Sequence, residues 1–387
     1  MPILNRVAEM HDEVTEWRRH LHTIPELLYD LHQTSAFVED KLRSFGCDEV
    51  VPGLGKTGVV GIIKGNLGDG PTIGLRADMD ALPLDEITGK PHASQTPGKM
   101  HACGHDGHTA MLLGAAKYLA ETRNFKGSVA VVFQPAEEGG AGAKAMIDDG
   151  LMDRFGISRV FGMHNMPGLP VGQFAIRPGP IMAATAEFTI TIKGRGGHAA
   201  MPHGTIDPIV IASQMVMALQ TIAARTTDPI DSIVVSVTKF HAGDAYNIIP
   251  QTALLAGTIR TLRTEVGEKA RERMRAICEG IAAANGATVD VHIDVNYPVT
   301  YNDPGETDFA IDIARDVAGE PGVHTGVNPV MGGEDFSYML EVRPGAFIFA
   351  GNGDTANLHN PSYDFNDELI PHGISYWVRL TETALAR

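Results

Sequence analysis

Residues 108–123, HTAMLLGAAKYLAETR, form a predicted helix between two short apolar runs, Thr72–Arg76 and Val129–Phe133. A strand, a helix and a second strand in this order make the crossover unit of parallel sheets. Three further runs of the same kind are Val59–Ile63, Val160–Met163 and Ala346–Ala350. The sequence therefore predicts an α/β fold with a mostly parallel sheet. In such sheets, ligand-binding groups lie in the loops just beyond the carboxyl ends of the strands.

Residues 185–297 follow a different pattern. They alternate as strand, helix, strand, strand, helix, strand, with the helices expected at residues 208–225 and 265–285. This βαββαβ order is typical of the ferredoxin-like fold, an antiparallel sheet with two helices on one face. The α/β pattern resumes afterwards. We therefore expect one domain of residues 1–184 and 298–387, interrupted by an inserted lid domain of residues 185–297.

The composition excludes several classes of protein. The chain has 387 residues with 47 acidic and 31 basic side chains, and its net charge of −16 opposes binding to nucleic acid or anionic lipid. The hydrophobic fraction of 43% is ordinary for a globular protein. We find no run of about 18 uncharged apolar residues, as a membrane span would need. Neither a nucleic acid nor a membrane is therefore expected as a partner.

The amino-terminal segment and the cysteines indicate a cytoplasmic protein. Arg6 and Glu9 lie where a signal peptide would need its apolar run. The segment instead has the spacing of a helix. The apolar residues at that spacing are Ile3, Val7, Met10, Val14 and Trp17. The three cysteines, Cys47, Cys103 and Cys278, are scattered and form no disulfide framework.

Residues 100–108, MHACGHDGH, contain the densest group of metal-binding residue types in the chain. Cys103 and His105 are separated by one glycine, so on an extended segment a thiolate and an imidazole could converge on one ion. The glycines argue against reading His101 and His105 as neighbours on a helix. One of these histidines could instead cap the helix that follows.

Acidic side chains follow two of the predicted strands. Asp78 and Asp80 are two residues apart, so they point to the same side of an extended chain. Glu137 and Glu138 are adjacent and point to opposite sides, so one could bind a metal ion while the other faces an attacking water. A capped turn and a solvated acidic loop are the structural alternatives.

Two more strands lead to His164 and His359. A single histidine in such a place is more often structural, but here five strand or loop ends carry possible ligands. Sulfur, nitrogen and oxygen donors together suit ions of the Zn²⁺ or Mn²⁺ class better than Ca²⁺ or Mg²⁺. More than four donors indicate two ions that share a bridging ligand and water. Motifs of the types HExxH, GxSxG and GxGxxG do not occur in the sequence.

The inserted domain offers three candidate substrate-binding residues. His198 follows a glycine-rich turn, Asn247 begins the segment NIIP, and Arg260 lies in GTIRT. Each alone could be an ordinary turn or strand residue. On a lid that closes over a metal site, His198 and Arg260 could bind an oxyanion or a substrate carboxylate.

These segments together resemble the M20 family of metallohydrolases, specifically the amidohydrolase branch with hippurate hydrolases, aminoacylase-like enzymes and auxin-conjugate hydrolases. The matching segments are RRHLHTIPEL (18–27), LRADMDALP (75–83), MHACGHDGHTA (100–110), FQPAEEGGAGA (133–143), GMHN (162–165), GRGGHAAMPH (194–203), NIIP (247–250), GTIRT (257–261), MGGEDFSYM (331–339) and LHNPSYDFND (358–367). They span nearly the whole chain in order. M20 peptidases carry His-x-Asp and a bridging Asp where this chain has Asp78 and Cys-Gly-His, which favours the amidohydrolase branch.

The resemblance implies a role for each candidate. The implied ligands of a dinuclear centre are Cys103, His105, Glu138, His164 and His359, with Cys103 as the bridge. Glu137 would be the general base and acid, and Asp80 would orient the metal site from behind. His198 would stabilise an oxyanion, while Asn247 and Arg260 would hold the substrate. The implied cofactor is a pair of divalent ions, Zn²⁺ or Mn²⁺, with Co²⁺ and Ni²⁺ as further candidates.

The resulting hypothesis is metal-dependent hydrolysis of the amide bond of N-acyl amino acids, hippurate-like or N-acetylated, by a catalytic domain of zinc-peptidase type. An M20-type dipeptidase or aminopeptidase is the alternative enzyme. A binding protein without activity and a single structural zinc are the non-catalytic alternatives. Because relatives dimerise through the lid, the resemblance also implies a homodimer or a dimer-based tetramer.

Overall fold

The computed structural model describes residues 4–386, which divide into two compact units. Unit 1 contains the residues up to Ile181, Tyr301–Asn328 and the residues from Asp335 onward. Unit 2 contains Met182–Thr300 and Pro329–Glu334.

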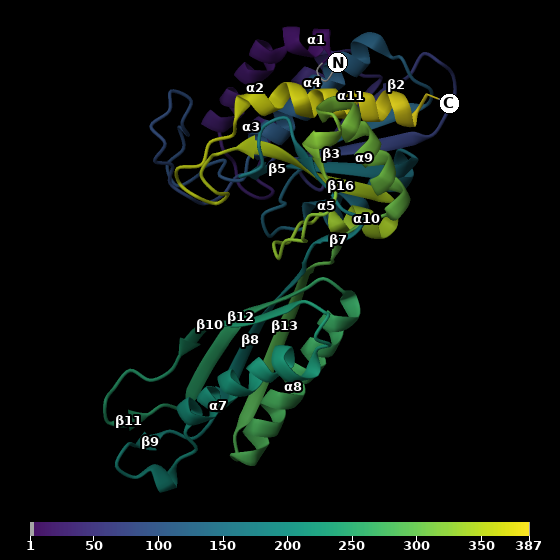
Figure 1. Cartoon of the computed structure of the whole chain (residues 1–387). Helices are drawn as coiled ribbons and strands as arrows, with labels where there is room; N and C mark the ends of the chain where they lie inside the picture. The colour runs from purple at the N-terminus through teal and green to yellow at the C-terminus, as the bar shows by residue number, and fades with distance from the viewer. Residues whose placement is uncertain (1–3, 387) are drawn as a thin grey trace. The chain divides into compact units, whose positions relative to one another are not determined.

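Unit 1 is built around an eight-stranded sheet with the order β1-β2-β4-β3-β5-β16-β6-β15 (Figure 1). The strands are β1 (Glu49–Leu54), β2 (Gly58–Lys64), β3 (Thr72–Asp78), β4 (Ser128–Gln134), β5 (Ile157–Pro167), β6 (Phe174–Ala175), β15 (Val323–His324) and β16 (Gly345–Gly353). The four central strands β4, β3, β5 and β16 run parallel, whereas β1, β2 and β6 pair antiparallel with their neighbours β2, β4 and β16. The predicted α/β fold with a mostly parallel sheet is confirmed.

The predicted apolar runs all lie within strands of this sheet, namely β2, β3, β4, β5 and β16. The remaining strands carry no comparable run. β6 and β15 have two residues each, and β1 contains Pro52 next to an irregularity in its pairing. A proline is tolerated there because β1 is an edge strand.

Among the helices of unit 1, α4 packs on the sheet. These helices are α1 (Asn5–Glu9), α2 (His11–Thr23), α3 (His32–Ser44), α4 (His105–Thr122), α5 (Gly142–Asp148), α6 (Leu151–Arg154), α9 (Pro304–Ala318), α10 (Ser337–Val342) and α11 (Ile370–Ala384). α2 and α11 lie beside α4 (Figure 1), and the three helices share one apolar core with the sheet.

The predicted amino-terminal helix is divided into α1 and α2 at Met10. Its apolar positions Val7, Met10, Val14 and Trp17 are all buried, as their spacing predicts. Ile3 lies outside the described residues.

Unit 2 has the predicted βαββαβ order. Its elements are β8 (Ala184–Lys193), α7 (Pro208–Thr221), β10 (Ile233–His241), β12 (Thr252–Thr261), α8 (Thr264–Ala284) and β13 (Thr288–Tyr297). The strands form an antiparallel sheet in the order β10-β12-β8-β13, and α7 and α8 pack together on it over an apolar core (Figure 1). This is the predicted ferredoxin-like fold. A short ribbon of β9 (Gly197–His198) and β11 (Ile248–Ile249) belongs to the same unit.

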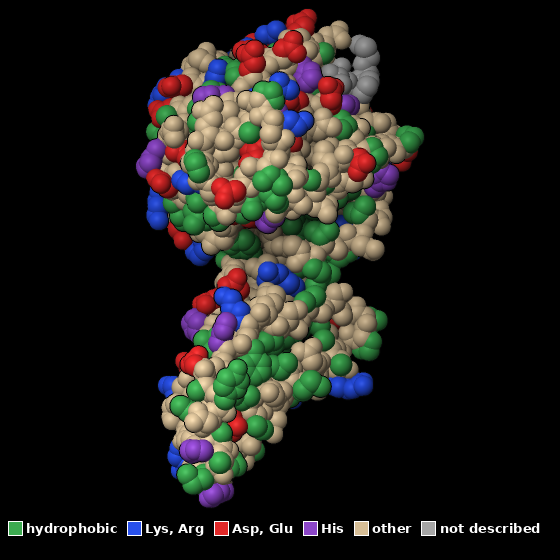
Figure 2. All heavy atoms as spheres, turned by 90° about the vertical axis from the view of Figure 1, so that its left-hand side faces the viewer, with side chains coloured by type: hydrophobic (Ala, Val, Ile, Leu, Met, Phe, Trp, Pro, Cys, Tyr) green, Lys and Arg blue, Asp and Glu red, His purple; other side chains and the backbone are tan. Residues whose placement is uncertain are grey.

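Helix α7 continues as a π-helix over Ile222–Thr226. By length and composition alone, Pro208–Thr226 could cross a membrane, with a mean hydropathy of 1.3, although only 28% of it is buried. A single such helix is weak evidence, because core helices of globular proteins pass the same test. Val210 and Met217 are its most exposed apolar residues. Apolar side chains also gather on the face of unit 2 shown in Figure 2.

Candidate metal centre

The carboxyl ends of the parallel strands in unit 1 bring the candidate residues of this unit together. These are Asp78 at the end of β3 and Asp80 just after it, Glu137 and Glu138 after β4, His164 near the end of β5, and His359 in the loop after β16. Cys103 and His105 join them from the start of α4. The arrangement follows the rule for open α/β sheets.

Cys103 and His105 lie at a helix start, so the expectation of an extended segment is wrong. His105 is the first residue of α4, and Gly104 precedes it with φ +92°. Glycine adopts this left-handed conformation without strain. A Cβ at Gly104 would stand only 2.3 Å from Nδ2 of Asn165. Gly104 therefore lets the chain turn between the two candidate ligands while it approaches the end of β5.

Two groups of possible ligands share Cys103. One group is Cys103, His105 and His164, and the other is Cys103, Glu138 and His359; within each group the donor atoms lie within 4.8 Å of one another. Sγ of Cys103 lies 3.3 Å from Nε2 of His164. Nε2 of His359 lies 3.2 Å from a carboxylate oxygen of Glu138. A thiolate common to two groups of three donors can bridge two ions.

The imidazole of His105 is buried, and neither ring nitrogen has a hydrogen-bond partner among residues 4–386. Carboxylate oxygens of Asp80 and Asp78 lie 3.4 and 3.7 Å from the ring nitrogens. Although burial alone would lower it, the charges of Asp78 and Asp80 raise the pKa of His105 to about 10. The surroundings of His105 thus favour a positive charge, which a metal ion bound to the ring would supply.

His164 is oriented by its own neighbour. Its Nδ1 lies 2.7 Å from the backbone carbonyl of Asn165, so Nδ1 carries the proton and Nε2 presents its lone pair toward Cys103. Burial and the adjacent His108 keep the pKa of His164 well below its usual range. The ring is therefore neutral, as a metal ligand must be.

The donor set fits a pair of transition-metal ions. It combines a thiol, three imidazoles and a carboxylate, which suits zinc-class ions rather than calcium. Burial, together with the charges of Glu138 and Glu137, holds the pKa of the Cys103 thiol well above its usual range. The site thus gathers negative charge, which a divalent cation would compensate.

Asp78 is held beside the metal centre by hydrogen bonds from two side chains. Its carboxylate accepts hydrogen bonds from Nη1 of Arg76 and from Nδ1 of His108, both at 2.6 Å. Asp78 is fully buried, so these contacts replace its hydration. The two acids therefore differ. Asp78 binds Arg76 and His108, whereas Asp80 reaches the turn that follows β4.

His108 and Asn165 have no role in the sequence-based hypothesis, yet both are part of the site. The backbone N–H of Asn165 donates to Nε2 of His108 at 2.9 Å. The Asn165 side chain donates to the carbonyl of Cys103 at 2.6 Å and accepts from the Tyr363 hydroxyl at 2.8 Å. Asn165 thus links the Cys103 turn, β5 and the loop after β16. The only sequence signal for these two residues is their place beside His105 and His164.

Glu137 and Glu138 lie in a turn, so the expected extended backbone is wrong at this point. Ala136 has φ +54°, which starts the turn. Asp80 accepts hydrogen bonds from both backbone N–H groups of Glu137 and Glu138 at 3.0 Å. On the far side of the turn, the hydroxyl of Tyr29 donates to the carbonyl of Gly140 at 2.6 Å. Hydrogen bonds to Asp80 and from Tyr29 therefore hold the turn that carries both glutamates.

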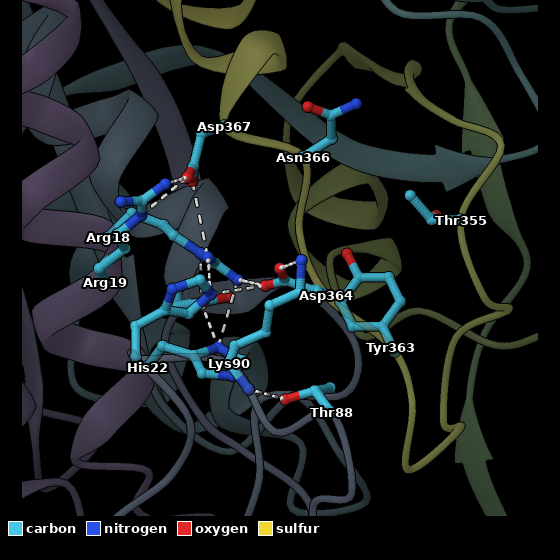
Figure 3. Close-up of polar contacts among 12 residues, drawn as sticks. Arg18, Arg19, His22, Thr88, Lys90, Thr355, Tyr363, Asp364, Asn366 and Asp367 are labelled. Atoms are coloured by element: carbon cyan, nitrogen blue, oxygen red, sulfur yellow. Dashed lines mark hydrogen bonds and ion pairs between the residues drawn. The ribbon is translucent and has the colours of Figure 1, made fainter.

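A second buried cluster lies next to the metal centre, around Arg18 and His22 of α2 (Figure 3). His22 Nδ1 lies 2.7 Å from Asp106, and His22 Nε2 lies 3.3 Å from Glu86. Although burial alone would lower it, Asp106 and Glu86 raise the pKa of His22 to about 9. The buried Arg18 and His22 are joined by the half-exposed Arg19 and Lys90, and His92 lies 3.1 Å from Asp364. The carboxylates of the cluster are Glu86, Asp106, Asp364 and Asp367. The motif RRHLH gives no hint of these partners.

In unit 2, His198 and Asn247 lie on the same ribbon. The backbone N–H of Ala199 donates to the carbonyl of Asn247 at 3.0 Å, and His198 pairs with Ile248. Both side chains are exposed. Nδ1 of His198 accepts from the N–H of Ala200 at 3.1 Å, so a neutral ring carries its proton on Nε2. Arg260 lies apart from this ribbon on β12, half-buried, and burial lowers its pKa.

Three comparisons relate the chain to known proteins. A family model described as peptidase family M20/M25/M40 matches residues 74–383. Hippurate hydrolase of Campylobacter jejuni is 43% identical over 380 residues, which cover 98% of each chain. N-acetyl-L-cysteine deacetylase of Bacillus subtilis is 42% identical over 355 residues, 91% of this chain and 83% of the relative. The crystal structure of the Bacillus subtilis YxeP protein, a dinuclear metal-binding peptidase from the M20 family, covers 98% of this chain and 99% of its own, with a TM-score of 0.85 and 36% identity.

Proposed function

Because the chain belongs to peptidase family M20/M25/M40 and is a hydrolase of the amidohydrolase type, we propose that it hydrolyses the amide bond of N-acyl amino acids. The products are a carboxylic acid and an amino acid. The observation that carries this proposal is the pair of donor groups sharing Cys103, with the further carboxylate of Glu137 beside them. Hippurate and N-acetylcysteine, which appear in the names of two relatives, are both N-acyl amino acids.

Two divalent ions would be held by the two donor groups. Cys103, His105 and His164 would hold one ion, and Cys103, Glu138 and His359 the other. We propose Zn²⁺ or Mn²⁺, with Co²⁺ and Ni²⁺ as substitutes that the same ligands accept. When bound, such ions lower the pKa of a water molecule and polarise an amide carbonyl.

Glu137 is the proposed general base and acid. It is buried and adjacent to Glu138, and one of its carboxylate oxygens lies within 4.8 Å of donor atoms of His105 and Glu138. From this position Glu137 takes the proton of the attacking water and returns it to the leaving amine nitrogen. Asp80 orients Glu137, because it binds the backbone of the glutamate turn.

Unit 2 supplies the proposed substrate contacts. His198 can donate from Nε2 to the oxyanion that develops on the attacked carbonyl, because its Nδ1 accepts a backbone hydrogen bond. Asn247 lies beside it on the ribbon and can bind the same substrate. Arg260 is proposed to bind the substrate carboxylate, since a guanidinium suits a planar anion.

A peptidase is the second candidate, because the YxeP structure is described as a dinuclear metal-binding peptidase. A dipeptidase or aminopeptidase requires a free α-amino group, whereas an N-acyl amino acid has none. The two activities therefore separate on substrates that differ only in that group.

The test is a substrate panel of benzoyl-glycine, N-acetyl amino acids and dipeptides. The metal-free protein is reconstituted separately with Zn²⁺, Mn²⁺ and Co²⁺, and amino acid release is measured. Preferred cleavage of benzoyl-glycine or N-acetyl amino acids supports the proposal. Preferred cleavage of dipeptides with a free amino group replaces it with the peptidase, and a folded, metal-loaded protein inactive on all of them overturns it.

We also propose a homodimer, or a tetramer made of such dimers, associated through unit 2 in the cytoplasm. The exposed apolar residues of α7, chiefly Val210 and Met217, support an interface there. A reducing compartment suits an enzyme that depends on the Cys103 thiolate. Sedimentation measurements of the Met217→Glu variant test the interface, since a charge on an apolar contact opposes association.

A further inference from the structure

Arg18 connects two segments that are far apart in the sequence. Its side chain is fully buried, and its guanidinium forms ion pairs with Asp106 at 2.8 Å, Asp364 at 2.5 Å and Asp367 at 3.5 Å. Asp106 lies in the first turn of α4, one residue after His105. Asp364 and Asp367 follow His359 in the chain. Figure 3 shows Arg18 between these two aspartates and the helix from which it extends.

His359 depends on such contacts more than the other proposed ligands do. It lies between Gly353 and Asp367, a stretch to which no helix or strand is assigned, and its side chain is 54% exposed. Its backbone has φ +60°, an unfavourable value for a residue other than glycine. Its backbone N–H donates to the carbonyl of Ala102 at 2.8 Å. The loop must therefore be held against the Cys103 turn for His359 to stay beside Glu138.

We propose that Arg18 is a positioning residue, which holds the loop of His359 against the turn of Cys103. It does so by binding Asp106, in the first turn of α4 just after Cys103, and Asp364 on that loop at the same time. The inference rests on the proposed function, because it concerns the ion assigned there to Cys103, Glu138 and His359. The ion assigned to Cys103, His105 and His164 has no proposed ligand on this loop.

An arginine is required for this role. Its planar guanidinium presents five N–H donors in a fixed geometry, so one side chain can bind carboxylates on two segments. A lysine keeps the positive charge but is a point charge on a flexible stem. Arg18→Lys therefore preserves the charge of the cluster while it loses the fixed connection between Asp106 and Asp364.

The experiment compares Arg18→Lys and Asp364→Asn with a matched control, Arg19→Gln. Arg19 is the next residue in the chain and is 52% exposed. Of the three aspartates that pair with Arg18, Arg19 pairs with Asp367 alone, at 2.9 Å. Each metal-free variant is titrated with Co²⁺, and bound ions per chain and their dissociation constants are measured. Circular dichroism and thermal unfolding show whether the variant is folded. If Arg18→Lys does not fold, Asp364→Asn becomes the test. The Asp364 side chain is 21% exposed, and its replacement leaves Arg18 paired with Asp106.

One of the two ions should be lost in His359→Ala. We expect that ion to bind between about 10-fold and about 100-fold less tightly in Arg18→Lys and Asp364→Asn. The other ion and the control Arg19→Gln should match the wild-type protein. Folded variants that bind both ions as the wild type does overturn the role of Arg18. A wild-type protein that binds fewer than two ions overturns the proposed dinuclear centre instead, so the two failures are distinguishable.

The combination with His359→Ala separates positioning from general stability. If Asp364 acts through His359, the ion that His359→Ala retains should bind as tightly in His359→Ala/Asp364→Asn as in His359→Ala alone. A purely structural role of Asp364 weakens the binding of this retained ion in the double variant, and that result overturns the inference.

Discussion

Gly104 lies so close to Asn165 that a Cβ at Gly104 would stand 2.3 Å from the amide nitrogen of the Asn165 side chain. The same Cβ would stand 2.6 Å from the hydroxyl of Tyr363. Three segments of the metal centre therefore meet at a position that has room only for a hydrogen atom.

Gly104→Ala should destabilise the protein more than Gly150→Ala, its matched control. Both glycines precede a helix in the same left-handed conformation, with φ +92° and +88°, but no atom lies within 4 Å of a Cβ at Gly150. Backbone strain alone costs about 1–2 kcal/mol, and overpacking adds about 1–3 kcal/mol at Gly104. Urea unfolding of the metal-free variants measures the difference. Equal losses of the free energy of unfolding would contradict the close approach.

Glu137→Gln should lower kcat by about 10²-fold to 10⁴-fold, because the amide cannot accept the proton of the attacking water. Two bound ions per chain should remain, since Glu137 belongs to neither donor group that shares Cys103. Steady-state kinetics and metal analysis of the same preparation check both expectations. A variant that loses its ions but keeps its rate per bound ion would remove Glu137 from the role of base.

The sequence predicts the sheet and the set of strand ends well, because both depend on local patterns. The apolar runs are short and are followed within five residues by Asp80, Glu138 and His164, so topology brings these residues together. The turn geometry was not predictable. An extended Cys103–His105 segment and an extended glutamate pair both fail, because left-handed conformations at Gly104 and Ala136 change the direction of the chain.

The buried cluster around Arg18 could not be predicted for a different reason. Arg18 and Asp364 are 346 residues apart, and no periodicity connects them. Charged residues in a motif such as RRHLH are usually exposed, so burial of Arg18 becomes evident only once α2 packs beside α4. The contacts of Asn165 could not be predicted either, since its partners Cys103 and Tyr363 come from distant segments.

His22 should make the stability of the metal-free protein fall as the pH rises. The groups that face His22 are Arg18, Glu86, His92, His101 and Asp106. Its pKa is about 9 in the folded protein, against an ordinary value of 6.5. Because the folded-state pKa is the higher one, the stabilisation is fully present below about pH 6.5 and is lost as the pH passes about 9.

The check is urea unfolding between pH 6 and pH 9.5 of the wild-type protein, His22→Gln and His20→Gln. His20 is exposed on the same helix and serves as the control. The wild type and His20→Gln should lose up to about 3 kcal/mol more over this range than His22→Gln. The same pH dependence in all three proteins would mean that His22 does not carry the effect.

Metal uptake should release protons and tighten with rising pH. The pKa of Cys103 is raised by burial and nearby carboxylates, and that of His105 is raised to about 10, so both hold protons at pH 7 without metal. An ion must displace them, and each proton released lowers the apparent Kd about tenfold per pH unit. Calorimetric titration with Zn²⁺ at pH 6.5–7.5, in two buffers of different ionisation enthalpy, counts the protons. An affinity independent of pH would contradict this protonation state.

Mixing inactive subunits should show on which chain His198 acts. If His198 of one subunit completes the site of its partner in the proposed dimer, Glu137→Ala and His198→Ala chains together form one intact site. Each variant alone should be nearly inactive, and a mixture should recover up to about a quarter of wild-type activity per chain, because about half of random dimers are mixed and each has one complete site. Differently tagged chains monitor subunit exchange, and Glu137→Ala mixed with itself is the control. Exchange without recovered activity would place His198 in the site of its own chain, since no mixed dimer would then contain a complete site.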